Sequence, residues 1–329
     1  MAGLPKIAVA LGDPAGIGPE LALKAAGDPC VRAACRPVLV GDPAVVSAHA
    51  KAGGIALVLR PIQRFDQAGG DAGEVDVFAC APVGDTPLRF AVSDGAYGRA
   101  AVEAARVAVQ AAMAGEVDAV VAAPQTEKSI ALAGIAFDGY PSFVAAQTGT
   151  PVHDVYLMIC FDDVRIAHCT LHVGVREALA LITPERVQRV IRAVHTSLQR
   201  IGIAKPKIYV SGLNPHAGED GLFGREEIDT IAPAIRAAAA SGIEASGPYA
   251  ADTMFRKPGA DAFVVMLHDQ GHIAAKLQAF DRAAALSIGT PIMFSSIPQG
   301  SAYDIAGQGK ANPAAMIAAI LRVAGAARP

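Results

Sequence analysis

The sequence predicts an α/β protein built on a largely parallel sheet. Short apolar runs typical of strands alternate with longer helical segments, and Gly, Pro or Asp bounds most of the runs. The composition agrees, because 52% of the 329 residues are hydrophobic, enough for a large buried core. Alternation of this kind favours parallel strands joined by helices that cover both faces of the sheet.

The elements follow in order along the chain. Each predicted strand contains at least two Val or Ile residues, which favour extended backbone. The predicted strands are 6–11, 37–41, 117–123, 155–160, 164–171, 207–212 and 262–267. The predicted helices are 98–114, 184–202, 225–241 and 312–326. Thr183 suits the N-cap of the second helix and Pro184 its first position. The Pro- and Gly-rich stretch 62–88 is expected to be an excursion within a domain.

Charge and cysteine content restrict the partners and the compartment. Lys and Arg number 28 against 31 Asp and Glu, a formal charge of −3, so electrostatics favours neither nucleic acid nor an anionic membrane. The five cysteines form no CxxC motif, as expected for reduced thiols. No apolar stretch is long enough to span a membrane, and the N-terminus has no signal-peptide pattern. We therefore expect a cytoplasmic enzyme that acts on a small molecule.

Three histidines each follow an apolar, strand-like run: His172, His216 and His268. Open α/β sheets bind ligands at the carboxyl ends of their strands. Three imidazoles that converge there bind a divalent metal and leave a coordination position open for substrate. Taken singly, each histidine is better explained as a loop or core residue, and the repeated context of the three is what favours a metal site.

A Gly-rich segment, GDPAGIGPE (12–20), directly follows the first strand. Such a turn into a helix exposes backbone N–H groups that bind phosphate or carboxylate. Its spacing matches neither GxGxxG nor the Walker loop. A tight strand-to-helix connection is the alternative interpretation.

Four motifs occur together and in order: GDPAGIGPE, LNPHAGE (213–219), LHDQG (267–271) and GSAYDIAGQGKANP (300–313). With them the chain resembles the 4-hydroxythreonine-4-phosphate dehydrogenase family from residue 6 to 325. This family belongs to the metal-dependent decarboxylating dehydrogenases, with the isocitrate and isopropylmalate enzymes. The resemblance implies two α/β/α domains around a central cleft. One comprises 1–128 plus 276–329 and contributes the NAD-binding loops; the other, 129–275, holds metal and substrate and dimerises.

The resemblance also implies cofactors, a partner and residue roles. His172, His216 and His268 become the metal ligands, and nitrogen ligands favour Zn²⁺, with Mg²⁺, Mn²⁺ and Co²⁺ as alternatives. The implied assembly is a homodimer whose active site lies at the subunit interface. NAD is expected to bind without a GxGxxG motif, at Gly12, Asp13, Asn214, Gly300, Ser301, Asp304 and Asn312.

The catalytic residues implied by the resemblance are Asp252, Asp269 and Lys276. Asp252 and Asp269 are the alternatives for the base, and Asp269 alternatively orients a ligand histidine. Lys276 is expected to anchor the substrate carboxylate. His272 is expected to contact that carboxylate or relay a proton.

Departures from the family pattern bear on the substrate. Members that oxidise the phosphorylated substrate have GHTE where this chain has Gly-Tyr-Pro-Ser (139–142), and their phosphate-binding Asn and Arg fall on Ala285 and Phe294. Ala and Phe supply no charged donor for a phosphate. Segments 134–142, 172–179, 266–273 and 285–289 instead resemble terephthalate 1,2-cis-dihydrodiol dehydrogenase. We therefore expect Tyr140, Ser142 and Phe294 to line an aromatic pocket; packing of the two rings in the core is the alternative.

The predicted function is NAD- and metal-dependent oxidation of a carboxylated cis-dihydrodiol, followed by decarboxylation to a catechol. The alternative is the 4-hydroxythreonine-4-phosphate dehydrogenase reaction of pyridoxal phosphate biosynthesis. Two further alternatives are a three-histidine metal hydrolase and a non-catalytic NAD or metabolite sensor.

Overall fold

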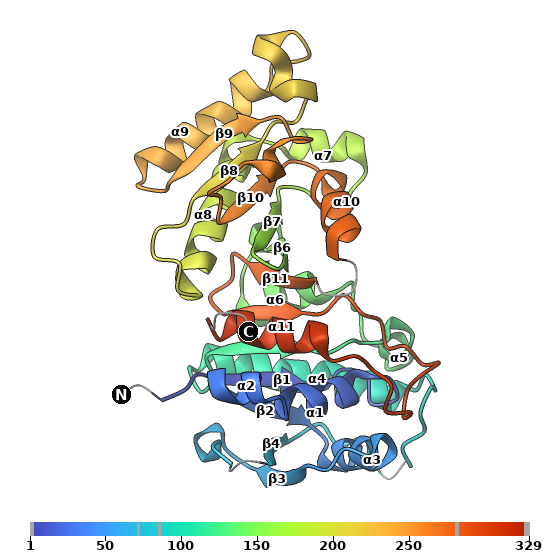
Figure 1. Cartoon of the computed structure of the whole chain (residues 1–329). Coiled ribbons are helices and arrows are strands. Elements are labelled where there is room, and N and C mark those ends of the chain that lie inside the picture. The colour runs from blue at the N-terminus through green and yellow to red at the C-terminus, as the bar shows by residue number, and fades with distance from the viewer. Residues whose placement is uncertain (1–2, 71–72, 85–86, 280–282, 326–329) are drawn as a thin grey trace. The chain divides into compact units, whose positions relative to one another are not determined.

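The computed structural model describes residues 3–70, 73–84, 87–279 and 283–325 (Figure 1). The chain forms two compact units, one of residues 1–150 with 291–329 and the other of residues 151–290. The chain crosses from one unit to the other at 150/151 and 290/291, whereas the predicted domain boundaries are earlier in the sequence, at 128/129 and 275/276. The roles assigned to the two parts stay predictions.

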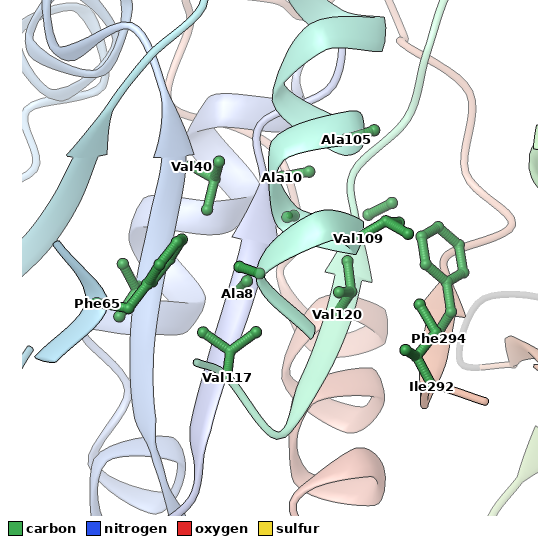
Figure 2. Packing of buried hydrophobic residues seen from close by; sticks show 14 of the residues in the cluster. Ala8, Ala10, Val40, Phe65, Ala105, Val109, Val117, Val120, Ile292 and Phe294 are labelled. Atoms are coloured by element: carbon green, nitrogen blue, oxygen red, sulfur yellow. The ribbon is translucent and has the colours of Figure 1, made fainter. Parts of the chain in front are cut away.

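The first unit contains a fully parallel sheet. Its order is β3 (Val58–Ile62), β4 (Glu74–Ala79), β2 (Arg36–Gly41), β1 (Lys6–Ala10), β5 (Ala119–Ala122) and β12 (Phe294–Ser296). Its helices are α1 (Gly18–Ala26), α2 (Pro29–Ala34), α3 (Pro43–Gly53), α4 (Gly95–Met113), α5 (Glu127–Leu132), α6 (Tyr140–Thr148) and α11 (Ala314–Val323), with a 3-10 turn at Phe65–Gln67. Helix α4 packs on β1, β2 and β5. Figure 2 shows Ala105 and Val109 of α4 facing Ala8 and Val120 of the sheet, and the small alanines allow this close packing.

The second unit contains a mixed sheet. Its order is β11 (Ala284–Ile288), β6 (Tyr156–Phe161), β7 (Val164–His168), β10 (Ala262–Val265), β8 (Ile208–Ser211) and β9 (Ala245–Tyr249). Strand β6 is antiparallel to β11 and β7, whereas β7, β10, β8 and β9 are parallel. A two-residue turn, Asp162-Asp163, joins β6 and β7 into a hairpin, and Asp162 has a φ of 42°.

Helices cover both faces of this second sheet. They are α7 (Val175–Leu181), α8 (Pro184–Arg200), α9 (Ala232–Ala240) and α10 (His268–Ala279). Shorter helical turns lie at Val152–Asp154, Pro215–Gly221, Glu227–Ile231 and Met254–Arg256. Both α8 and α10 contact β6, β7 and β10, and Figure 1 shows them on opposite sides of the sheet.

The predicted α/β class is confirmed, and every predicted strand and helix is present in part or in full. The sequence patterns missed β3, β4, β9, β11 and β12. Strand β9 (ASGPY) is too polar and Gly/Pro-rich for a strand signal, and β4 lies inside the expected excursion. The last helix ends at Val323, and residue 326, its predicted end, lies outside the described residues. Among the described residues, no helix is long and apolar enough to cross a bilayer.

Candidate active site

Three neighbouring parallel strands of the second unit each lead into one of the singled-out histidines. His172 follows β7, His268 follows β10 and His216 follows β8. Strands β7 and β8 both pair with β10 in parallel, so the carboxyl ends of all three meet at one edge of the sheet. The fold therefore places the three loops at the edge where α/β sheets bind ligands.

His172 and His268 form a pair at this edge. Their ring centroids are 5.6 Å apart. A metal–nitrogen bond of about 2.0–2.1 Å puts the rings of two tetrahedral ligands roughly 5 Å apart, so the pair fits one ion. His268 Nδ1 lies 2.6 Å from Asp269 Oδ1, which places the ring proton on Nδ1 and leaves Nε2 free as a ligand.

His216 lies in a different environment. Its Nδ1 is 3.0 Å from Glu219 Oε2, and its ring packs edge-on to Phe223 with centroids 6.0 Å apart. The backbone from His216 to Asp220 is left-handed at every residue, a strained conformation typical of functional loops. Within the described part of the chain, no three His, Cys, Asp or Glu side chains are grouped to hold a metal. The single chain thus brings together two of the three predicted ligands.

Two further histidines extend the pair into a cluster. The His272 ring stacks on His268 with centroids 3.8 Å apart, and its Nδ1 lies 3.1 Å from His168 Nε2. Burial and neighbouring imidazoles lower the pKa of His168 to about 3 and that of His272 to about 4. The sequence patterns did not single out His168, although it lies only four residues before His172.

Two polar side chains that the sequence did not single out, the half-buried Gln270 and the buried Glu227, hold the loops in place. Gln270 Oε1 accepts hydrogen bonds from the backbone of Met266 and Leu267, and its amide donates to the Gly212 carbonyl at 3.1 Å. Glu227 accepts from the backbone N–H of Leu213 and of Asn214, both at 2.7 Å. Burial opposes ionisation of Glu227, but these hydrogen bonds outweigh it and hold its pKa below the ordinary value. Each side chain ties a ligand-bearing loop to a neighbouring segment.

A concavity of about 400 Å³ opens beside the histidine pair. Its lining comes from the loop after β7, the start of α7 and the start of α10, and includes Thr170, His172, Val173, Val175, His268 and Asp269. Lys276 is exposed on the last turn of α10. Asp252 is exposed in the turn before the helical segment Met254–Arg256.

The two rings predicted to line an aromatic pocket lie in or against the core of the first unit. Phe294 is fully buried in the core of the first unit, and Figure 2 shows its ring beside Val109. Tyr140 packs against the same cluster, 5.2 Å from the Phe294 ring, and its hydroxyl donates to the Ala123 carbonyl at 2.8 Å. Ser142 donates to Asp138. The Phe294 ring is therefore enclosed by the core, and the partly buried Tyr140 ring packs against it.

The predicted cofactor residues lie in both units. In the first, Gly12 adopts a φ of 69° where a Cβ would meet the Pro124 carbonyl. Asp13 is buried and accepts hydrogen bonds from the Tyr303 hydroxyl at 2.7 Å and from the Ala15 backbone N–H at 2.8 Å. Its carboxylate therefore binds to protein groups of the first unit.

The C-terminal loop of the first unit is more open. Gly300, Asp304 and Asn312 are exposed, and Ser301 accepts from Thr126 at 2.7 Å. Lys24 donates to the carbonyls of Gly309 and Ala311. In the second unit, Asn214 donates to Glu226 and Glu227, which holds the His216 loop.

The chain is similar to proteins of stated activity along nearly its whole length. It is 38% identical over 323 residues to a D-threonate 4-phosphate dehydrogenase from Cupriavidus necator, covering 96% of each chain. A 4-hydroxythreonine-4-phosphate dehydrogenase structure from Klebsiella pneumoniae aligns with a TM-score of 0.89 at 33% identity, covering 98% of this chain and 99% of the other. A terephthalate 1,2-cis-dihydrodiol dehydrogenase from Burkholderia xenovorans aligns at 0.76 with 41% identity and 98% coverage of each chain.

These similarities overturn the predicted cis-dihydrodiol substrate. The curated relatives are D-threonate 4-phosphate dehydrogenases, and the two structures with TM-scores of 0.88 and 0.89 act on a phosphorylated hydroxy acid by their names. The prediction depended on Tyr140 and Phe294 as pocket residues; Phe294 belongs to the core, and the partly buried Tyr140 packs against it. The alternative reaction is therefore the better supported one.

The family match agrees with this correction. Residues 33–323 match the family described as pyridoxal phosphate biosynthetic protein PdxA. The whole-length relatives are named as dehydrogenases of D-threonate 4-phosphate or of 4-hydroxythreonine 4-phosphate. The chain belongs to the PdxA family of dehydrogenases.

Proposed function

We propose that this protein is an NAD-dependent dehydrogenase that oxidises the 3-hydroxyl of D-threonate 4-phosphate. The observation that carries the proposal is the His172–His268 pair, with Asp269 behind it, at the edge of a concavity. The name of the Cupriavidus relative supports this substrate. The second candidate substrate is 4-hydroxythreonine 4-phosphate, which the names of the solved structures support. It differs by an amino group in place of the 2-hydroxyl.

The donor set supports a divalent ion held by imidazole nitrogen. His172 and His268 would hold it through their free ring nitrogens, and nitrogen ligands favour Zn²⁺ over Mg²⁺. When bound, such an ion lowers the pKa of a substrate hydroxyl and stabilises negative charge on oxygen. Asp269 keeps the His268 ring in the tautomer that can bind.

The first unit supports NAD binding at its C-terminal loop. The exposed carboxylate of Asp304 suits the hydroxyls of a ribose, and exposed Gly300 lets backbone approach a phosphate. A Cβ on Gly16 would lie 2.7 Å from the Cβ of Ser301, so glycine there allows the two loops to pack.

The reaction balances as a hydride transfer followed by decarboxylation. The C3–H bond breaks and its electron pair passes as hydride to the nicotinamide, while the hydroxyl proton passes to a base. The resulting 3-keto acid loses CO₂ when its C1–C2 bond breaks, and C2 then takes a proton. Because Asp269 is engaged with His268, Asp252 is the candidate base. Lys276 is the candidate cation for the substrate carboxylate.

We propose further that the enzyme is a homodimer in which His216 of the partner subunit completes the metal site. Two observations support this. The Nδ1 atom of His216 faces a carboxylate, as that of His268 does, but His216 is not part of the His172–His268 pair. Large apolar side chains are exposed on α7 and α10, namely Val175, Leu179, Ile273 and Leu277, and such side chains are typical of an interface.

The test is NADH formation by zinc-loaded enzyme. D-threonate 4-phosphate and 4-hydroxythreonine 4-phosphate are compared at equal concentration, with terephthalate cis-dihydrodiol as the control substrate. We expect D-threonate 4-phosphate to have the highest kcat/KM. Turnover of neither phosphorylated compound would overturn the proposal.

A further inference from the structure

His168 and His272 form a hydrogen-bonded pair of rings from two different elements. His168 is the last residue of β7, and His272 lies one turn after His268 on α10. His168 is only 1% exposed, whereas His272 is partly exposed beside the His172–His268 pair. The pair therefore connects the interior of the sheet to the proposed active site.

The contacts of His168 determine where its proton lies. Its Nδ1 is 3.3 Å from the Leu157 carbonyl oxygen, which can only accept, so Nδ1 carries a proton. A buried imidazole among other imidazoles is held neutral and carries one proton. His168 Nε2 therefore has a lone pair and accepts from His272 Nδ1 at 3.1 Å.

A glycine makes this contact possible. A Cβ at Gly271 would lie 2.3 Å from His168 Nε2 and 2.8 Å from an Ile166 methyl carbon. Any other residue at this position would push the His168 ring away from α10. The helix surface is thus shaped to receive His168.

The tautomer of His168 in turn determines the tautomer of His272, because His272 must donate from Nδ1 to His168 Nε2. With its proton on Nδ1, a neutral His272 ring has its lone pair on Nε2. A carboxylate offers only lone pairs and cannot bond to that atom, whereas a hydroxyl can donate to it. This changes the sequence-based expectation that His272 contacts the substrate carboxylate.

We propose that His168 is a positioning residue that holds His272 as the Nδ1–H tautomer, so that His272 Nε2 accepts a hydrogen bond from a substrate hydroxyl. This inference rests on the proposed function for the identity of the substrate. The tautomer itself depends only on the fold. His268, His272 and Lys276 recur every four residues along α10, so the hydroxyl contact lies between the metal ligand and the candidate carboxylate cation.

The first experiment measures the tautomer directly. In metal-free protein labelled with ¹⁵N-histidine, long-range ¹H–¹⁵N spectra distinguish a protonated Nδ1 from a protonated Nε2. We expect His272 to be protonated on Nδ1, and the His168→Leu variant to show a mixture of tautomers. A wild-type His272 protonated on Nε2 would overturn the proposal whatever the activity of the enzyme.

The second experiment is a double-mutant cycle with D-threonate 4-phosphate. His168→Leu and His272→Leu should each raise KM about tenfold, the effect of one lost hydrogen bond, and the double variant should be no worse than His272→Leu. His168→Gln keeps an acceptor near the Nε2 position and should restore KM to within about threefold. Additive effects, or an unchanged KM in His272→Leu, would contradict the proposal. Absence of turnover in the wild type would count against the proposed function alone.

Discussion

At the residue scale, two of the candidate ligands share one arrangement. His268 and His216 each face a carboxylate through Nδ1, from Asp269 and Glu219 respectively. A carboxylate behind the ring fixes the tautomer and raises the basicity of the opposite nitrogen. The repeated arrangement supports a ligand role for His216, although the structure leaves it outside the pair.

Removing the carboxylate behind His268 should weaken metal binding. We expect Asp269→Ala to lower zinc affinity by about tenfold or more, since loss of such partners typically costs 10–100-fold. Competition with a chromophoric chelator measures this affinity. Asp252→Ala is the matched control and should bind zinc as the wild type does, because Asp252 is exposed and lies in a different segment, the turn before Met254–Arg256. Equal losses in the two variants would contradict the assignment.

The contact between Gly271 and His168 predicts a stability effect. Gly271→Ala should lower the free energy of unfolding by about 1–3 kcal/mol, the usual range for overpacking a well-packed site. Urea denaturation measures it. Gly300→Ala is the control, because a Cβ there has no heavy atom within 4 Å, and it should change stability by less than about 0.5 kcal/mol. A tolerated Gly271→Ala would show that His168 can move without cost.

At the element scale, the loop after β8 depends on one buried carboxylate. Glu227 is 3% exposed and binds the N–H groups of Leu213 and Asn214. Gly212 and Gly218 leave room for it, since a Cβ on either would lie within 3.0 Å of a Glu227 oxygen. The His216 loop is therefore built around Glu227.

Glu227→Gln should therefore destabilise the protein in a pH-dependent way. The pKa of Glu227 is lowered from its ordinary value of 4.5, so its ionised form contributes stability that is complete above that value. This contribution is lost as the pH falls through the lower pKa of the folded state. Wild type and variant should differ by about 1–3 kcal/mol at pH 7 and converge in acid, as measured by urea midpoints. The exposed neighbour Glu226→Gln is the control, and a pH-independent difference would contradict the argument.

At the scale of the whole molecule, the proposed dimer predicts complementation between inactive variants. A site that combines His268 of one subunit with His216 of the partner subunit is lost in both His216→Ala and His268→Ala. A heterodimer of the two variants regains one intact site of its two. Since random pairing yields half heterodimers, co-refolded protein should recover about a quarter of wild-type activity. NADH formation measures this, and no recovery would indicate a site within one chain.

The parts of the fold that were predictable have strong local signals. The strands at 6–11 and 262–267 are continuous apolar runs, and Thr183 with Pro184 marks the start of a helix. Strands such as β9 and β12 lack such a signal because they are polar or only a few residues long. Pairing with neighbouring strands stabilises them, and that interaction is not local.

The sequence by itself determined the family, the α/β class and the position of His172, His216 and His268 after strands, because each depends on a contiguous motif or run. Only the tertiary structure decided which side chains meet. It joined His168 to His272 across 104 residues, paired His172 with His268 and buried Phe294 in the core. These outcomes depend on packing between distant segments, and the spacing of residues along the chain does not encode that packing.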